Sequence, residues 1–324
     1  MRAPPGTLRD WRFWLLGTAL LALVAALFLP RLTLTREARD LLVVIDVTGS
    51  MNVRDYEVDG APTARLAVAK RAARDLLAAL PCQSRLGLGI FTERRSFLLF
   101  EPAEVCENYA AIDGALEGLD WRMAWEGDSH VARGVHAALA IAASLPADLV
   151  FLTDGQEAPP LAGGALPAFE GEPGKVAGVI VGVGSPNPSP IPKFDADGRE
   201  TGFYAEQDVP QEDRSGPPPA DAPSRAGWNP RNAPWGGEAA TGTEHLSTLR
   251  EGHLGNLAAQ TGLGFAVLRD AGALVAVVDT NTRVRPVALR VDIAAIPAAL
   301  ALLCLTLLFT AGALVGRRPE RLPA

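Results

Sequence analysis

Three oxygen-bearing side chains, spaced two residues apart, follow the first short β-branched segment of the chain. Residues 41–45 are all apolar, as in a buried strand of a parallel sheet, and Asp46, Thr48 and Ser50 come directly after them. The carboxyl ends of such strands are where open α/β sheets bind ligands. One carboxylate and two hydroxyls are ligands that suit a hard divalent cation. The same pattern also fits an ordinary polar turn, so this motif alone leaves both interpretations open.

A second strand and a loop farther along the chain supply more oxygen ligands. Residues 148–153 form another apolar segment, which runs into a Thr-Asp-Gly turn. Between the two strands, residues 125–130 lead into an amphipathic helix, for which Asp128 or Ser129 is the expected N-cap. Two strand ends and one loop therefore predict a divalent-metal site whose ligands are Asp46, Thr48, Ser50, Ser129 and Asp154.

Strands and helices alternate along residues 38–283, which predicts one α/β domain with a doubly wound, mostly parallel sheet. One antiparallel edge strand is expected at residues 96–101, after a tight turn. Residues 184–243 form a long Pro/Gly-rich insertion, in which 191–204 predict a small hairpin. The expected strands are 41–45, 85–91, 96–101, 148–153, 176–183 and 264–268, and the expected helices are 65–80, 107–119, 131–144, 252–261 and 270–282.

Two apolar, charge-free segments flank this domain. Residues 13–30 and 293–316 are each predicted to be transmembrane helices, with tails at 1–12 and 317–324. A cleaved signal peptide is the alternative for the first, although a small-x-small cleavage pattern is missing. Arginines near the two spans are almost balanced, and they favour cytoplasmic tails only slightly.

The cysteines give an independent indication of the compartment. Cys82 follows the helix at 65–80, and Cys106 is expected at the same edge of the sheet after the antiparallel strand. Their proximity suits a disulfide in an oxidising compartment, while two reduced thiols remain the alternative. Cys304 lies in the second apolar segment. Together these features predict a bacterial inner-membrane protein whose domain is periplasmic.

Composition and motif content argue against two other classes of function. The net charge of −7 and the lack of a basic stripe argue against a nucleic-acid partner. The four histidines have no metal-ligand spacing, and no Gly-rich phosphate loop follows the first strand. Ser50 has no evident base, so hydrolysis is disfavoured and no enzyme activity is predicted.

The order of the oxygen-rich pieces resembles the metal-ion-dependent adhesion site (MIDAS) of von Willebrand factor A (VWA) domains. The resemblance implies that Thr48, Ser50 and Ser129 bind a divalent cation, Mg²⁺ or Ca²⁺, directly. Asp46 and Asp154 would act mainly through water. Thr48 stands where the family usually has Ser, and Ser129 where it has Thr, and both keep the hydroxyl.

In this family a partner protein supplies a Glu or Asp to the open position of the metal. The resemblance therefore implies a protein partner with an accessible carboxylate. Asp128, beside Ser129, is a further candidate ligand, which would favour Ca²⁺.

Across nearly its whole length the chain resembles bacterial membrane-anchored VWA proteins associated with MoxR-type AAA+ ATPases. The segments VTGSMNVRDY, PCQSRLGLGIFTERRSFLLF and TDGQEAPP resemble most the MxaL-like accessory proteins of methanol-oxidation clusters. This implies maturation of, or metal insertion into, a periplasmic quinoprotein dehydrogenase. A surface adhesin or a stress-response complex subunit is the alternative.

Overall fold

Six strands form the central sheet, in the order β13-β8-β7-β2-β5-β6. The computed structural model describes residues 10–28, 32–124, 128–161, 164–195, 197–209, 218, 220–225, 228, 243, 245–291 and 293–315. All neighbouring strands pair in parallel except β6, which pairs antiparallel with β5. The predicted mostly parallel sheet with one antiparallel edge strand is therefore confirmed. Its strands are β2 (Asp40–Asp46), β5 (Arg85–Thr92), β6 (Arg95–Glu104), β7 (Asp148–Thr153), β8 (Gly178–Val183) and β13 (Gly264–Leu268).

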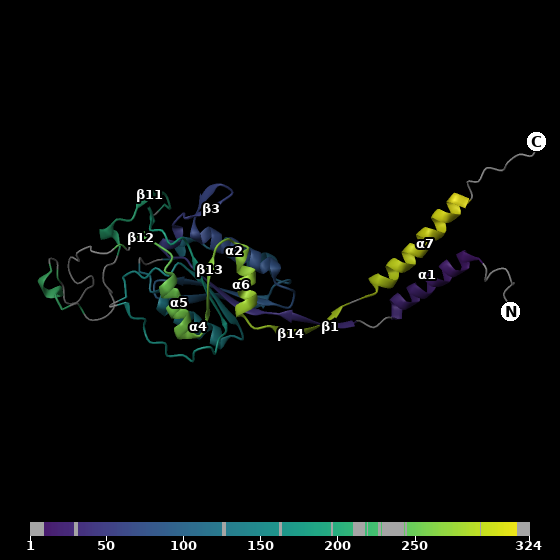
Figure 1. The fold of residues 1–324 in the computed structure, drawn as a ribbon, viewed down its shortest axis with the longest axis horizontal. Helices are drawn as coiled ribbons and strands as arrows, with labels where there is room; N and C mark the ends of the chain where they lie inside the picture. Colours follow the sequence, from purple (N-terminus) through teal and green to yellow (C-terminus); the bar gives the residue numbers. More distant parts are fainter. Residues whose placement is uncertain are drawn as a thin grey trace, which may run out of the picture. The chain divides into compact units, whose positions relative to one another are not determined.

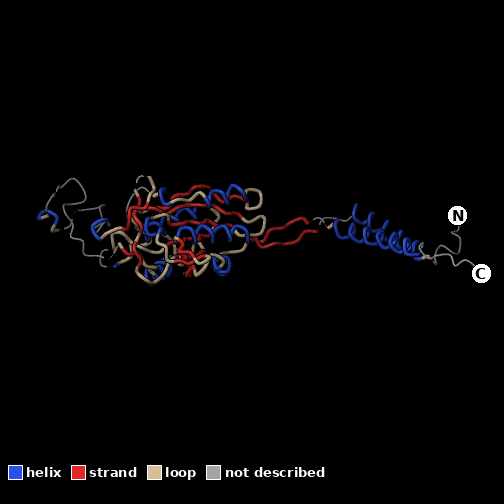
Figure 2. The backbone as a smooth tube through the Cα atoms, turned by 90° about the horizontal axis from the view of Figure 1, so that it is seen from above, coloured by secondary structure: helices blue, strands red, loops and turns tan. Residues whose placement is uncertain are grey.

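Helices cover both faces of the sheet, as Figures 1 and 2 show. Along β2, Leu41 and Val43 belong to one buried cluster and Leu42 and Val44 to the other, because successive strand side chains point to opposite faces. The first face packs against α2, α3 and α6, and the second against α4 and α5. These helices are α2 (Arg65–Ala79), α3 (Tyr109–Glu117), α4 (Val131–Ser144), α5 (Glu251–Thr261) and α6 (Ala273–Asn281).

Helix α4 approaches the sheet closely at Gly134. A Cβ atom there would lie 2.2 Å from the Phe91 ring, which is itself fully buried. Gly134→Ala is therefore expected to lower the free energy of unfolding by about 1–3 kcal/mol through overpacking. Gly114→Ala in α3 is the matched control, since no atom lies within 4 Å of that Cβ position and alanine favours a helix. Urea denaturation of both variants checks the prediction, and equal effects would contradict it.

Short elements surround the sheet. A hairpin is formed by β3 (Tyr56–Val58) and β4 (Ala61–Thr63), and the predicted insertion hairpin by β10 (Pro192–Phe194) and β11 (Glu200–Phe203). At the ends of the insertion, β9 (Ser189–Pro190) pairs with β12 (Leu246–Ser247).

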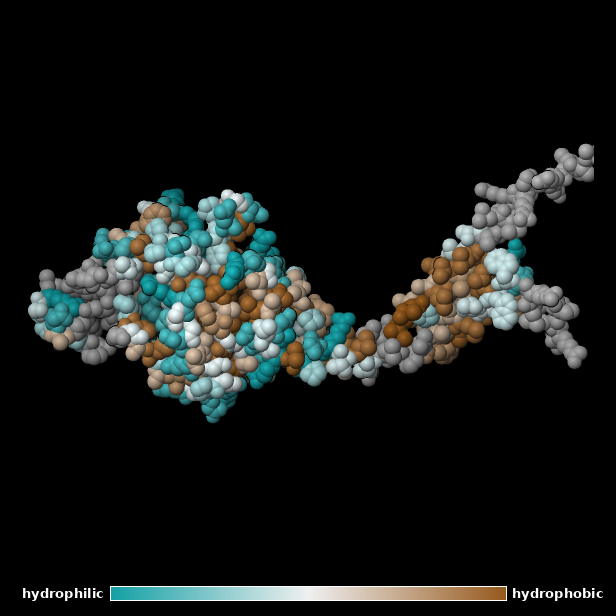
Figure 3. Space-filling view, viewed as in Figure 1, coloured by the Kyte–Doolittle hydropathy of each residue, from teal (hydrophilic) through white to brown (hydrophobic). Residues whose placement is uncertain are grey.

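The segments flanking the domain form a separate unit, residues 1–36 and 286–324. It contains α1 (Trp11–Phe28) and α7 (Ala295–Val315), with Ala19 and Ala22 packed against Ala301 and Cys304. Apolar residues cover both helices (Figure 3). Strands β1 (Leu32–Ala38) and β14 (Arg285–Val291) pair with each other, a pairing that the sequence did not predict.

Of the two predicted membrane-spanning helices, one is a candidate span in the structure. Among the described residues, α1 is the one helix long and apolar enough to cross a membrane. The part Ala295–Thr310 of α7 forms a shorter apolar helical stretch. The second predicted span, at 293–316, therefore stays a prediction. The outer tail residues 1–9 and 317–324 lie outside that part.

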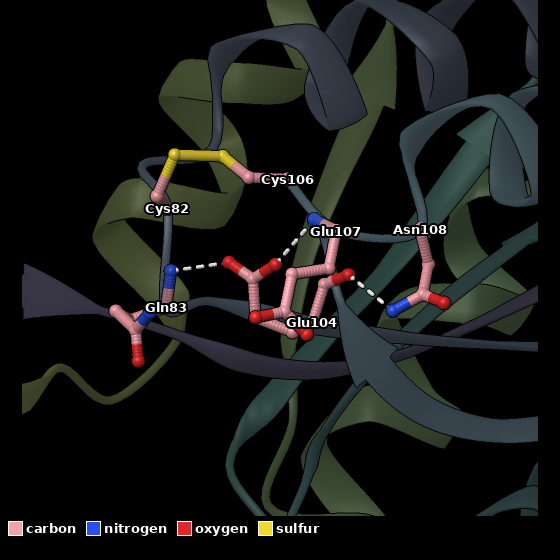
Figure 4. Close-up of a disulfide and its surroundings, with 6 residues drawn as sticks. All are labelled: Cys82, Gln83, Glu104, Cys106, Glu107 and Asn108. Atoms are coloured by element: carbon pink, nitrogen blue, oxygen red, sulfur yellow. Dashed lines mark hydrogen bonds between the residues drawn. A yellow bond between two sulfur atoms is a disulfide. The ribbon is translucent and has the colours of Figure 1, made fainter.

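Cys82 and Cys106 are joined by a disulfide, with their Cα atoms 5.3 Å apart (Figure 4). The Glu104 carboxylate lies beside it and accepts hydrogen bonds from the Gln83 and Glu107 amides, each at 2.6 Å. The bond closes the loop that contains all of β5 and β6.

Removing this cross-link is expected to destabilise the domain. For a loop of this length, the Cys82→Ser/Cys106→Ser double variant is expected to lose about 3 kcal/mol of unfolding free energy. Thiol labelling of unfolded, non-reduced protein should modify Cys304 alone and, after reduction, all three cysteines. Labelling of Cys82 or Cys106 without reduction would contradict the pairing.

Candidate functional site

Asp46 is the centre of a buried group of oxygen atoms at the carboxyl end of β2. Its Oδ1 accepts hydrogen bonds from the Thr48 amide at 2.9 Å and from the Thr48 hydroxyl at 2.7 Å. The hydroxyl oxygens of Thr48 and Ser50 lie 3.3 Å apart. Thr48 is the residue before the short 3₁₀ turn η2 (Gly49–Asn52), which folds the chain back on itself. The structure thus brings Asp46, Thr48 and Ser50 together, and all three are buried.

The neighbouring strand β7 contributes a hydroxyl that the sequence analysis did not assign to the site. Thr153 Oγ1 donates to Asp46 Oδ2 at 2.6 Å and accepts a hydrogen bond from the Gly155 amide at 3.1 Å. In the parallel register Ile45 lies opposite Leu152, so the next residues are Asp46 and Thr153. That shared position, directly after the last apolar pair, is the signal that could have identified Thr153. Both carboxylate oxygens of Asp46 therefore have protein donors.

Ser129 is held by segments that follow the strands on both sides of β2. Its amide donates to the Ala158 carbonyl at 2.6 Å, and its carbonyl accepts from the Ala158 amide at 2.8 Å. The next amide, of His130, donates to the Glu93 carbonyl at 2.6 Å. Glu93 follows β5 and Ala158 follows β7, and β2 runs between these strands. Ser129 therefore lies over the end of the strand that carries Asp46.

The Ser129 hydroxyl is the one predicted ligand whose oxygen has no hydrogen-bond partner among the described residues. It is also buried. Leaving a buried polar atom unpaired costs about 1–3 kcal/mol, so such an atom in a folded protein calls for a ligand or water.

Asp128 is buried beside Ser129, and its carboxylate faces two basic side chains. Asp128 Oδ2 lies 3.7 Å from an Arg94 guanidinium nitrogen and 3.9 Å from His130 Nε2. Arg94 in turn lies 3.2 Å from Glu93. The other predicted loop residues, 125–127, lie outside the described part of the chain.

The predicted N-cap of the helix at 131–144 is wrong. Neither Asp128 nor Ser129 caps it, because α4 begins directly after His130. Instead the Glu157 carboxylate accepts hydrogen bonds from the amides of Val131 and Ala132, at 3.1 and 2.9 Å. A side chain from the turn after β7 thus satisfies the first helical amides, which leaves Ser129 free of that role.

Asp154 is held on both of its oxygens. Oδ1 accepts the Gln156 amide at 2.9 Å, while Oδ2 accepts Arg65 Nη1 at 2.7 Å and Ser247 Oγ at 3.0 Å. Arg65 is fully buried and is not among the site residues predicted from the sequence. Its place on the apolar side of a predicted helix was the sequence signal that could have identified Arg65 as a buried charge. The ion pair offsets part of the charge of Asp154, whereas the donors to Asp46 among the described residues are the neutral groups of Thr48 and Thr153.

The environment of Asp46 favours a positive ligand. Burial, followed by the charge of Asp154, raises the pKa of Asp46 to about 7, against the opposing hydrogen bonds from Thr153 and Thr48. In metal-free protein the carboxyl group thus retains its proton until near neutral pH. The raised pKa means that a bound cation would relieve an unfavourable negative charge.

The predicted ligands fit a hard divalent cation. They offer hydroxyl and carboxylate oxygens, the ligands that Mg²⁺ and Ca²⁺ take in proteins. They include an unpaired hydroxyl at Ser129 and an uncompensated carboxylate at Asp46.

A conventional cluster of metal-binding side chains is found elsewhere. Among the described residues, Cys82, Glu104 and Cys106 form the one group of at least three His, Cys, Asp or Glu residues close enough to share an ion. Both thiols of that group are consumed by the disulfide. A metal at Asp46 therefore remains a prediction based on hydroxyl ligands.

Residues 41–156, which contain all the predicted ligands, match the family model of the von Willebrand factor type A domain. The parallel sheet and its covering helices agree with that match, and the chain therefore contains a VWA domain with an α/β fold. VWA domains are generally protein-interaction modules rather than enzymes, and they often bind a divalent metal.

Solved structures that the chain matches include an aerotolerance-related membrane protein from Bacteroides fragilis NCTC 9343, with 14% identity and a TM-score of 0.45, covering 75% of this chain and 98% of that one. A membrane-spanning protein from Vibrio fischeri has 18% identity and a TM-score of 0.29, with coverage of 75% and 97%. A von Willebrand factor type A protein from Catenulispora acidiphila has 12% identity and a TM-score of 0.38, with coverage of 84% and 46%. No functional conclusion follows from likenesses this low. The comparison with curated protein sequences finds no match.

Proposed function

We propose that this protein is a membrane-tethered interaction module that binds a divalent cation at a MIDAS and captures a carboxylate of a partner protein. The proposed ligands are Thr48, Ser50 and Ser129, with Asp46 and Asp154 acting mainly through water. The observation that carries the proposal is the unpaired, buried Ser129 hydroxyl over the end of β2, the strand that ends at Asp46, whose pKa is raised. Cation binding would resolve both features at once.

Helix α1 supports the tether, because it is long and apolar enough to span a membrane. The disulfide between Cys82 and Cys106 supports an oxidising compartment, since such bonds persist there. We therefore place the VWA domain in the periplasm, anchored in the inner membrane.

The partners are proposed from the sequence motifs. The segments around Thr48, Cys82 and Asp154 resemble those of VWA proteins associated with MoxR-type ATPases and methanol oxidation. The proposed role is thus maturation of, or metal insertion into, a periplasmic enzyme of the quinoprotein dehydrogenase type. The MoxR-type ATPase complex would act on the same assembly.

Affinity purification of the full chain from solubilised membranes tests this function. Wild-type protein is expected to retain its partner with Mg²⁺ or Ca²⁺ and to lose it in chelator. Asp46→Asn is expected to lose capture in both conditions, and Asp75→Asn, an exposed control on α2, is expected to keep it. Capture that survives both chelator and Asp46→Asn would contradict the metal bridge. Mass spectrometry of the bound proteins distinguishes a MoxR-type ATPase or dehydrogenase from an adhesin ligand.

A further inference from the structure

Arg65 is the most densely bonded buried charge near the proposed metal site. It is the first residue of α2, and no part of its side chain is exposed to solvent. Its Nε and Nη2 donate to Asp55 at 2.6–3.1 Å, and its Nη1 donates to Asp154 at 2.7 Å. Nη1 also donates to Ser247 Oγ at 2.6 Å, and Nη2 to the Ser247 carbonyl at 3.3 Å. The planar guanidinium thus binds three different segments in one fixed geometry.

The residues at the two ends of the insertion contact the ion pairs of this arginine, Ser185 through Asp55 and Ser247 directly. Ser185, directly after β8, donates its amide to Asp55 Oδ2 at 2.8 Å. Ser247, in β12, donates its hydroxyl to Asp154 Oδ2 at 3.0 Å and lies opposite Ser189 in the pairing with β9. The two ends of the insertion therefore meet each other and share the carboxylates that Arg65 holds.

The neighbouring carboxylates keep the Arg65 side chain positively charged. Burial alone would lower the pKa of Arg65, but the charges of Asp154 and Asp55 outweigh it, so the pKa is raised and the side chain stays cationic. Two carboxylates and one guanidinium leave the cluster with one net negative charge. Asp154 is thus held in place without being fully neutralised.

We propose that Arg65 is a positioning residue that holds Asp154 and both ends of the insertion in one arrangement, and so couples cation binding to the seating of the insertion. This inference rests on the proposed function, because it concerns the same metal site. The link is Asp154 Oδ2, which both Arg65 and Ser247 contact. If that oxygen shifts toward a bound cation, its hydrogen bonds with Arg65 and Ser247 change. Coupling of this kind is reciprocal, so the seated insertion in turn favours the cation.

Ser247→Ala tests the coupling without removing a proposed metal ligand or the buried charge. Mg²⁺ titration of the full chain in detergent, by calorimetry, is expected to show affinity reduced at least about fivefold. Ser84→Ala is the matched control, because that serine is equally buried but bonds to the Arg39 amide, at the other end of the strands. It is expected to bind Mg²⁺ like the wild type.

Hydrogen exchange supplies a second measurement. In wild-type protein Mg²⁺ is expected to slow exchange at the Ser185 and Ser247 amides, and in Ser247→Ala this response is expected to disappear. Wild-type affinity and an unchanged exchange response in Ser247→Ala would overturn the coupling while leaving the metal site intact. If wild-type protein binds no Mg²⁺, the proposed function itself fails. The positioning role of Arg65 is then tested in metal-free protein. Arg65→Lys is expected to speed hydrogen exchange at the Ser185 and Ser247 amides relative to Ser84→Ala. Unchanged exchange would overturn the positioning role.

Discussion

Replacing Asp46 with asparagine is expected to abolish divalent-cation binding and to make the metal-free protein more stable at pH 8. The buried carboxylate lacks a cationic hydrogen-bond donor, and its pKa is raised from 3.8 to about 7. Asparagine removes the charge and keeps the acceptor that Thr48 contacts, while the Thr153 hydroxyl can turn to accept from the new amide. The gain in unfolding free energy is expected to be on the order of 3 kcal/mol. Binding sites often lower the stability of the ligand-free protein, because the groups that bind the ligand are unfavourable without it.

The sign of the pH dependence follows from the raised pKa. Between the unfolded pKa of 3.8 and the folded pKa of about 7, the folded state holds a proton on Asp46 that the unfolded state has lost. The stability that this proton contributes is fully present below pH 3.8 and is lost as the pH rises through 7. The free energy of unfolding therefore falls by about 1.4 kcal/mol per pH unit in between.

Urea denaturation in chelator, from pH 5 to pH 8, measures this effect. Asp46→Asn should remove the part of the slope that Asp46 contributes, and Asp75→Asn should leave the wild-type slope. Saturating Mg²⁺ should restore wild-type stability at pH 8 and have no effect on Asp46→Asn. A loss of stability at pH 8 in metal-free Asp46→Asn would show that the carboxylate is a structural group.

Arg65→Gln is expected to destabilise the domain by about 3–5 kcal/mol, the usual cost of breaking a buried ion pair. The substitution leaves Asp55 and Asp154 without their cation, in surroundings where both side chains are at most 6% exposed.

Arg74→Gln in the same helix is the matched control for Arg65→Gln. Arg74 also makes a two-pronged contact with an aspartate, Asp113, but its side chain is 40% exposed. Water screens that pair, so little change in stability is expected. Urea denaturation of the two variants side by side checks the comparison. Similar losses would refute the special role of the buried arginine.

Local patterns in the sequence predicted the sheet and most of the proposed ligands. Residues 41–45 and 148–153 carry the apolar runs of buried parallel strands, and each run ends where the structure ends β2 and β7. Because adjacent parallel strands end at the same edge, Asp46 and Asp154 had to lie near one another. Strand polarity alone thus located the site.

Contacts between distant segments were not predictable in this way. The Arg65 network joins residues up to 182 positions apart, and no local period encodes such a pairing. Glu157 replaced the predicted cap of α4 for the same reason, since the turn after β7 reaches the helix only in the folded domain. The pairing of β1 with β14 likewise depends on chain ends that meet only after folding.

The central claim is that hydroxyl oxygens at the end of β2 bind one divalent cation, and a Mg²⁺ titration of wild type and Ser129→Ala tests it most directly. Ser129 Oγ has no hydrogen-bond partner among the described residues, so removing it deletes a proposed ligand without breaking a bond. Isothermal titration of the full chain is expected to show one saturable site in wild-type protein and an affinity at least about tenfold lower in Ser129→Ala, a loss of about 1.4 kcal/mol. Absence of saturable binding in the wild type, or equal affinities in the two proteins, would contradict the claim.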